Sequence, residues 1–237
     1  MSDTIKLTID GRSVTAAKGA TILDAAREAN ILIPSLCHNA ELKPYGACRL
    51  CMVEIIQKKR RRMVAACIFE VAEDLVVETN TTPVQNVRRL VIELLLARNP
   101  RHPVLLKIAA DLGVARSRFD VEVKGCILCG QCVRTCREVV GVAAIGFSGR
   151  GPARKVSTPF DQAPVDCIAC GSCAYICPVD VIPLKEENDI RTIWKTPFPM
   201  QKCEKCGSII APVKQLEYFR DEFNLPEKHF SLCHQCR

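Results

Sequence analysis

Two runs of cysteine with one shared spacing constrain this sequence more than any other feature. The runs CILCGQCVRTC and CIACGSCAYICP both follow the pattern C-x2-C-x2-C-x3-C. Their cysteines are Cys126, Cys129, Cys132 and Cys136 in the first run and Cys167, Cys170, Cys173 and Cys177 in the second. Closely spaced thiolates of this kind bind the corners of a cubane iron-sulfur core. Two complete repeats favour a pair of 4Fe-4S clusters over zinc or a chance pattern.

The repeats resemble those of bacterial two-cluster ferredoxins, in which the fourth Cys of each run binds the other run's cluster. The resemblance implies one 4Fe-4S cluster held by Cys126, Cys129, Cys132 and Cys177. It implies a second cluster held by Cys136, Cys167, Cys170 and Cys173. Pro178 follows the second run as the pattern prescribes, whereas Arg137 stands at that place in the first run. This departure changes a turn and removes no ligand.

The cysteine content and the N-terminal sequence together indicate the cellular compartment of the protein. The 237 residues include 16 Cys, far above ordinary usage, and the opening MSDTIKLTIDG lacks the basic and apolar regions of a secretory signal. We therefore expect reduced thiols in the cytoplasm and metal binding rather than disulfides. The longest apolar run, 90–97, is broken by Glu93 and is too short to span a bilayer, so no direct membrane insertion is expected.

The first eighty residues predict a small β-rich domain with its own cysteine set. Ile5, Leu7 and Ile9 alternate with polar residues before an Asp10-Gly11 turn, which predicts a hairpin. The stretch from Thr21 to Asp24 is similar to a capping box for a helix that runs to residue 29. A hairpin, a crossing helix and a cysteine loop between further strands resemble a β-grasp ferredoxin. The basic residues 58–62 lie where a turn is needed, so a solvated hairpin tip is favoured over a nucleic-acid patch.

Four further cysteines in this region suit a 2Fe-2S cluster, which needs two ligands for each iron. They are Cys37, Cys48, Cys51 and Cys67, spaced C-x10-C-x2-C-x15-C. The alternative is four buried free thiols, which this spacing makes improbable. The spacing differs from the plant type and resembles the N-terminal domain of the large iron-sulfur subunit of respiratory complex I and of NAD-linked hydrogenases. Gly46 leaves room for backbone N–H groups to approach the sulfurs.

The helix that follows carries a motif from which the cysteines are missing. Thr82-Pro83 predicts an N-cap with proline at the first helical position. An apolar stripe at helical period follows, made of Val84, Val87, Leu90, Val91, Leu94 and Leu95. In the family, a one-histidine, three-cysteine 4Fe-4S site comes next. The resemblance places its histidine at His102 and its cysteines at Leu106, Ala109 and Ala115. We therefore expect an ordinary histidine in a segment that survives as packing.

The chain ends with two C-x2-C pairs, Cys203 with Cys206 and Cys233 with Cys236, separated by 26 residues. Paired knuckles suit tetrahedral zinc, and Gly207 allows the tight turn of a zinc ribbon. The separation is longer than usual for zinc, so an additional iron-sulfur cluster is the alternative. His229 and His234 lie nearby but are not needed for four-coordination. The residues 213–225 between the pairs have a helical pattern.

These segments predict an α+β chain with four parts. They are a β-grasp 2Fe-2S ferredoxin domain (1–80), a helical segment at the degenerate cluster site (81–118), a two-cluster 4Fe-4S ferredoxin domain (119–190) and a four-Cys metal-binding region (191–237). We expect a hairpin and loop between the two runs, because Gly146, Gly149 and Gly151 do not form the nucleotide-binding pattern G-x-G-x-x-G.

The resemblance, which covers residues 1–184, implies an iron-sulfur electron-transfer subunit of complex I-like, NAD(P)-linked oxidoreductases. It implies a flavoprotein NAD(P)H-binding partner and a second redox subunit or ferredoxin, in a hydrogenase, formate dehydrogenase or electron-bifurcating transhydrogenase complex. We expect a relay without catalytic residues. The alternatives are a self-contained small reductase and a zinc-containing nucleic-acid adaptor. The formal charge of +7 gives the adaptor little support, because cluster thiolates offset it, so we expect no nucleic-acid partner.

Overall fold

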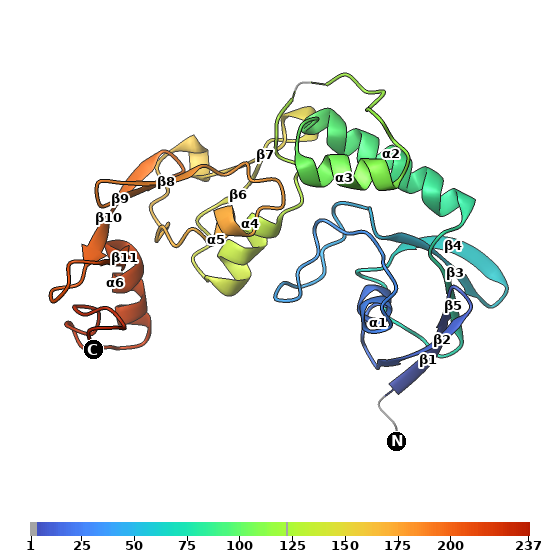
Figure 1. Ribbon diagram of the computed structural model, residues 1–237, viewed down its shortest axis with the longest axis horizontal. Helices are drawn as coiled ribbons and strands as arrows, with labels where there is room; N and C mark the ends of the chain where they lie inside the picture. Colours follow the sequence, from blue (N-terminus) through green and yellow to red (C-terminus); the bar gives the residue numbers. More distant parts are fainter. Residues whose placement is uncertain (1–3, 122) are drawn as a thin grey trace. The chain divides into compact units, whose positions relative to one another are not determined.

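A computed structural model describes residues 4–121 and 123–237 of the chain. The residues form two compact units, one ending at Cys129 and the other beginning at Gly130, which are described in turn. Figure 1 follows the chain from the N-terminal sheet in blue to the C-terminal helix in red. No helix within the described ranges is long and apolar enough to cross a membrane.

The N-terminal unit begins with a five-stranded mixed sheet of order β2-β1-β5-β3-β4. Its elements are β1 (Thr4–Ile9), β2 (Arg12–Ala17), α1 (Ile22–Glu28), β3 (Met52–Gln57), β4 (Arg60–Ala65) and β5 (Leu75–Glu78). Strand β1 pairs antiparallel with β2 and parallel with β5, and β3 joins β5 to β4. Helix α1 packs against this sheet (Figure 1). This arrangement confirms the predicted hairpin and β-grasp domain.

The capping box predicted for α1 is present. Thr21 is the N-cap, its Oγ1 accepts from the backbone N of Asp24 at 3.2 Å, and the Asp24 carboxylate accepts from the backbone N of Thr21 at 3.1 Å. Ile22, Leu23, Ala25 and Ala26 then enter the core of the sheet. The cap thus fixes where the helix starts, and the buried face fixes its position on the sheet.

The basic run forms part of the β3–β4 hairpin. Lys58 and Lys59 both have positive φ, as a two-residue turn of the type I′ class requires, and residues 60–62 continue into β4. The predicted tip is therefore confirmed for the two lysines, while the arginines belong to the strand.

Two helices follow the sheet, α2 (Thr82–Arg98) and α3 (Pro103–Asp111). The N-cap of α2 is Thr81 rather than the predicted Thr82, and Pro83 is the second helical residue. The predicted stripe was partly wrong, because Leu90 and Leu94 are 42% and 47% exposed. The buried face instead contains Val84, Arg88, Ile92, Glu93, Leu95, Leu96 and Ala97. Arg88 and Glu93 interrupt the apolar residues of this face, so the face is not recognised from hydrophobic periodicity alone.

The second unit begins at Gly130, inside the first cysteine repeat, and contains the connection and the second repeat. Its first elements are α4 (Gln131–Arg134), a π-helical turn (Thr135–Val139), β6 (Gly146–Ser148), β7 (Lys155–Ser157) and α5 (Ser172–Tyr175). Strands β6 and β7 pair antiparallel, which confirms the hairpin predicted between the repeats. Cys132, Cys167 and Cys173 share a buried core with Ile145, Ile193 and Phe198.

A four-stranded antiparallel sheet, which the sequence did not predict, leads to the chain's last cysteines. Its order is β11-β10-β9-β8, with β8 (Leu184–Glu187), β9 (Ile190–Ile193), β10 (Thr196–Lys202) and β11 (Ile209–Pro212). Helix α6 (Val213–Glu222) contacts β10 and β11 (Figure 1). The helix lies within the predicted range 213–225.

Candidate metal centres

The first cysteine set comes together beside the N-terminal sheet. Cys37, Cys48, Cys51 and Cys67 are all buried, with exposures of 5% or less. Cys37, Cys48 and Cys51 lie between α1 and β3, and Cys67 follows β4. The backbone N of Cys48 donates to Cys37 Sγ at 3.4 Å. The thiol of Cys37 interacts with those of Cys48 and Cys67, and the thiol of Cys51 interacts with that of Cys67.

The pKa values of these four thiols are shifted in opposite directions, because the thiols interact with one another. The thiols of Cys48 and Cys67 lower the pKa of Cys37 to about 2, with help from the backbone N–H groups of Cys48 and Ala47. The pKa of Cys51 falls to about 7, chiefly because of the Cys67 thiol, whereas the pKa values of Cys48 and Cys67 rise. Four buried thiols this close cannot all lose their protons unless positive charge compensates them, which iron provides.

Arg88 adds a positive charge that sequence reasoning missed. It lies on α2, is 4% exposed, and its Nη2 donates to the carbonyl oxygen of Met52 at 2.8 Å, one residue after Cys51. Burial lowers the pKa of Arg88, while the charges of Cys51 and Asp10 act in the opposite direction. A buried guanidinium within electrostatic reach of Cys51 stabilises negative charge on this cysteine set. Its position, four residues after Val84, lies on the apolar side of the helix by helical period, and a charged residue on that side was the available signal.

The two cysteine repeats have the same local geometry. In each, the second residue after the first cysteine has positive φ and donates its backbone N to that cysteine's sulfur at 3.4 Å. These residues are Leu128, which donates to Cys126, and Ala169, which donates to Cys167. A left-handed glycine, Gly130 or Gly171, then caps the short helix α4 or α5. Repeated sequence therefore produces repeated N–H···S contacts, as cluster ligands require.

The second unit gathers the set that the ferredoxin pattern assigns to one cluster. Cys136, Cys167, Cys170 and Cys173 line one cavity with Ile168, Ile193 and Trp194 among its walls. The charges of these thiols act on one another, and the backbone N of Ala144 donates to Cys136 Sγ at 3.2 Å. Burial raises the pKa values of Cys136 and Cys167 and raises that of Cys173 to about 12. Cys136 thus lies with the triplet of the other repeat.

The remaining repeat cysteines are Cys126, Cys129, Cys132 and Cys177. Cys129 and Cys132 are buried, whereas Cys126 and Cys177 are partly exposed. Their assignment to one 4Fe-4S cluster stays a prediction from the spacing.

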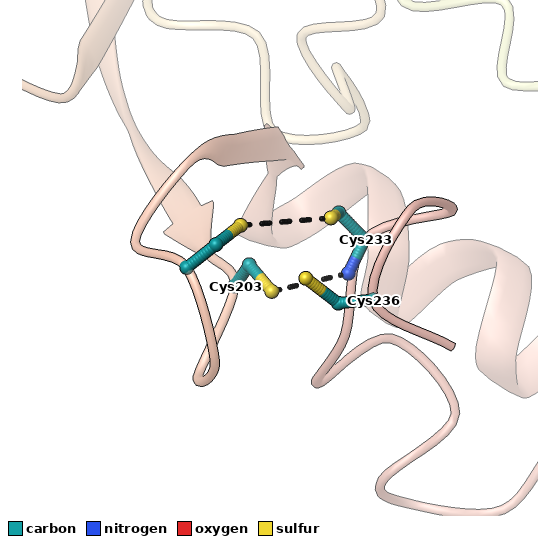
Figure 2. A group of neighbouring side chains, drawn as sticks. Cys203, Cys233 and Cys236 are labelled. Atoms are coloured by element: carbon teal, nitrogen blue, oxygen red, sulfur yellow. Dashed lines mark hydrogen bonds between the residues drawn. The ribbon is translucent and has the colours of Figure 1, made fainter.

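The last four cysteines form a compact thiol group. The sulfurs of Cys203, Cys206, Cys233 and Cys236 all lie within 4.8 Å of one another. Figure 2 shows the side chains of Cys203, Cys233 and Cys236 pointing toward one another. Cys206 Sγ lies 3.7 Å from Cys233 Sγ, and the backbone N of Cys233 donates to Cys203 Sγ at 3.4 Å.

Local turns build this last group. The backbone N of Gly207, with φ of 71°, donates to the Cys203 carbonyl at 2.9 Å, and the backbone N of Cys236 donates to the Cys233 carbonyl at 3.0 Å. Backbone N–H groups of Cys233 and Cys206 lower the pKa of Cys203 to about 6, whereas the Cys206 thiol raises that of Cys236 to about 12. His229 and His234 are not in this group.

The degenerate site at α3 differs in part from expectation. His102 is the N-cap residue of α3, with Pro103 first in the helix. Ala109 is buried with Leu105, as packing requires, but Leu106 is 43% exposed and Ala115 is also exposed. The predicted packing role therefore holds for Ala109, whereas the exposure of Leu106 and Ala115 contradicts it at those two positions.

Two family models match the chain. A 2Fe-2S iron-sulfur cluster binding domain matches residues 2–82, and a 4Fe-4S dicluster domain matches residues 125–181. The first contains the set from Cys37 to Cys67, and the second contains both repeats.

Several curated proteins are similar to most of the chain. The subunit alpha of NADPH-Fe(3+) oxidoreductase of Geobacter sulfurreducens is 34% identical over 86% of this chain and 27% of its own length. The 75 kDa subunit of NADH-ubiquinone oxidoreductase of Reclinomonas americana is 32% identical over 76% of this chain and 29% of its own length. Subunit HndD of the NADP-reducing hydrogenase of Solidesulfovibrio fructosivorans is 30% identical over 75% of this chain and 36% of its own length. The chain thus spans about a quarter to a third of these relatives.

A solved structure is similar in fold as well. The crystal structure of an NAD+-reducing [NiFe]-hydrogenase in the H2-reduced state contains a chain that aligns with a TM-score of 0.66 and 29% identity. The alignment covers 74% of this chain and 85% of that one. The chain therefore belongs to the iron-sulfur proteins that join a 2Fe-2S cluster binding domain to a 4Fe-4S dicluster domain, and over most of its length it is similar to subunits of NAD(P)H-linked oxidoreductases and hydrogenases.

Proposed function

We propose that this chain relays single electrons through one 2Fe-2S and two 4Fe-4S clusters, as a subunit of a cytoplasmic NAD(P)H-linked oxidoreductase. The observation that carries this proposal is the convergence of Cys136 with Cys167, Cys170 and Cys173 around one cavity. Crossed ligation of this kind is the hallmark of two-cluster ferredoxins, whose clusters exchange one electron each. The protein's own contribution is to supply thiolates, bury them and donate backbone N–H groups to their sulfurs.

We propose the four parts predicted from the sequence, 1–80, 81–118, 119–190 and 191–237, as the domains of the chain. The ligand sets lie in the first, third and fourth parts. Cys37, Cys48, Cys51 and Cys67 would hold the 2Fe-2S cluster. Cys126, Cys129, Cys132 and Cys177 would hold one 4Fe-4S cluster, and Cys136, Cys167, Cys170 and Cys173 the other. The donor chemistry fits, because thiolates accepting backbone N–H bonds are the usual environment of such clusters.

The four C-terminal cysteines are proposed to bind one zinc ion. Around a tetrahedral ion with Zn–S bonds of about 2.3 Å, the sulfurs lie about 3.8 Å apart. The 3.7 Å between Cys206 and Cys233 and the 4.8 Å limit for the whole group agree with this geometry. A cubane cluster places each thiolate on a different iron and needs a wider group. The geometry therefore favours zinc over the additional cluster.

A flavoprotein is the proposed electron donor or acceptor on one side, and a second redox subunit or ferredoxin on the other. This proposal is supported by the similar proteins, which are subunits of NADH- and NADPH-linked enzymes. A flavin converts the two-electron hydride of NAD(P)H into single electrons that clusters accept. Electron bifurcation by such a complex stays a prediction.

Elemental analysis of anaerobically purified chain tests the cluster assignment. About ten iron, ten acid-labile sulfides and one zinc per chain are expected. About fourteen iron without zinc would place a third cubane in the chain and contradict the zinc proposal. Fewer than about six iron would contradict the relay itself.

The alternative of a self-contained reductase is tested separately. The isolated chain, loaded with clusters, is mixed with NADH or NADPH and a soluble acceptor such as ferricyanide. The relay predicts no turnover until a flavoprotein is added, whereas steady turnover by the chain alone would support the reductase.

A further inference from the structure

One aromatic side chain from outside both repeats lines the cavity that contains Cys136, Cys167, Cys170 and Cys173. Trp194 lies in the two-residue turn between β9 and β10, where it and Lys195 have φ values of 51° and 59°. The neighbouring Ile193 is 1% exposed and belongs to the same core as Cys167 and Cys173. The tight turn therefore holds the indole against the cysteines.

The walls of this cavity are mostly apolar. Besides the four cysteines they include Val140, Val142, Ile168 and Ile193, and Trp194 and Ser172 are the lining residues whose side chains carry an N–H or O–H donor. In such surroundings each hydrogen bond to a cluster sulfur has a large effect, because water does not screen it.

Trp194 lines the same cavity as the four cysteines, and its indole N–H interacts with a thiol there. Trp194 Nε1 is buried, and within the described residues it has no hydrogen-bond partner of ordinary geometry. The thiol that it influences is Cys173, which is 8% exposed. A donor that stabilises the thiolate of Cys173 stabilises negative charge at that position.

We propose that Trp194 raises the reduction potential of the second 4Fe-4S cluster by donating its indole N–H to the ligand Cys173. The inference rests on the proposed function, since it needs a cluster held by Cys136, Cys167, Cys170 and Cys173. Reduction adds negative charge to the cluster and its thiolates, so a donor at a ligand sulfur favours the reduced form. Trp194 does not bind iron and acts through Cys173, as a positioning residue. Trp194 also forms part of the wall of the cavity that these four cysteines line.

The test is Trp194→Phe, which keeps an aromatic ring and removes the donor. We expect one of the two 4Fe-4S couples to move to a more negative midpoint potential in an EPR-monitored redox titration. The other 4Fe-4S couple, the 2Fe-2S couple and the iron content should stay at their wild-type values. Tyr175→Phe is the control, because it removes the hydroxyl of a residue that is 74% exposed and lies two residues after the same cysteine. Unchanged couples in Trp194→Phe would overturn the inference.

A measurement on the wild-type chain covers the case in which the variant fails to assemble. Trp194 is the single tryptophan of the sequence, so 15N-indole labelling marks one atom. Pulsed EPR of the reduced protein should detect coupling of this 15N nucleus, and of one exchangeable proton, to a 4Fe-4S spin. Absence of both couplings would overturn the inference while leaving the clusters in place. Absence of any 4Fe-4S signal would instead contradict the proposed function.

Discussion

At the scale of single residues, the electrostatics of the candidate centres come partly from groups outside the cysteine motifs. Arg88 and Trp194 lie on a helix and a turn that carry no ligand, yet each acts on a cysteine of a proposed cluster. Motif spacing reveals ligands because coordination fixes their separation. It does not reveal such neighbours, whose approach depends on how distant segments pack.

Arg88→Gln should lower the potential of the 2Fe-2S cluster and destabilise the N-terminal unit. The substitution removes the positive charge near Cys51 and the charged donor to the Met52 carbonyl, a loss of about 2 kcal/mol. Redox titration and chemical denaturation measure the two effects. Arg101→Gln, which removes an exposed charge, is the control. Equal behaviour of the two variants would show that Arg88 has no influence on the cluster.

Zinc binding by the C-terminal cysteines should release more protons at pH 5.5 than at pH 7.5. With its pKa lowered to about 6, Cys203 is already a thiolate at pH 7.5 in the metal-free chain and is mostly protonated at pH 5.5. The difference should be about one proton per zinc. Calorimetry in buffers of different ionisation enthalpy measures it. If Cys203→Ser shows the same pH difference as the wild type, another group is responsible.

At the scale of elements, the sequence predicted best where a local rule acts alone. The hairpin β1–β2, the capped helix α1 and the β6–β7 hairpin follow from turn residues, a capping box and a connection between fixed motifs. The buried face of α2 was mispredicted because Arg88 and Glu93 are buried while Leu90 and Leu94 are exposed. The sheet β8–β11 was missed because its short, polar strands include Pro197 and Pro199, which weaken a strand signal.

Gly171→Ala should reduce occupancy of the second 4Fe-4S cluster. Gly171 has φ of 80°, and an added Cβ would lie 2.8 Å from Leu184 Cδ1 and 2.9 Å from Tyr175 Cε2. Gly113→Ala is the matched control, since Gly113 has φ of 70° and nothing within 4 Å of an added Cβ. Both variants carry the left-handed strain of about 1 kcal/mol, so only the first should lose iron. Equal iron contents would show that the close packing at Gly171 is not needed for assembly.

His102→Asn should leave the iron content of the chain unchanged. At its three cysteine positions the degenerate motif has Leu106, Ala109 and Ala115, and one imidazole does not hold a cluster. Asparagine remains a suitable N-cap for α3, so the helix should be kept. Iron analysis and circular dichroism check both points. A loss of about four iron would mean that this histidine binds a cluster after all.

At the scale of the whole chain, the proposed metal centres explain the high cysteine content and change the net charge. Sixteen cysteines and a formal charge of +7 suggest a basic protein, but deprotonated thiolates in four centres add negative charge that offsets it. Twelve of these cysteines lie within the two matched family domains, and the last four lie beyond them. Under the proposed function, the chain carries three single electrons and binds a structural ion at its last four cysteines.

The number of electrons that the chain accepts is the decisive measurement of the proposed relay. The anaerobic, fully oxidised chain is reduced coulometrically while its EPR spectra are recorded. We expect about three electrons per chain, one entering a 2Fe-2S centre and two entering 4Fe-4S centres, with the zinc site silent. Uptake of one electron or none by a chain with its full metal content would contradict the relay.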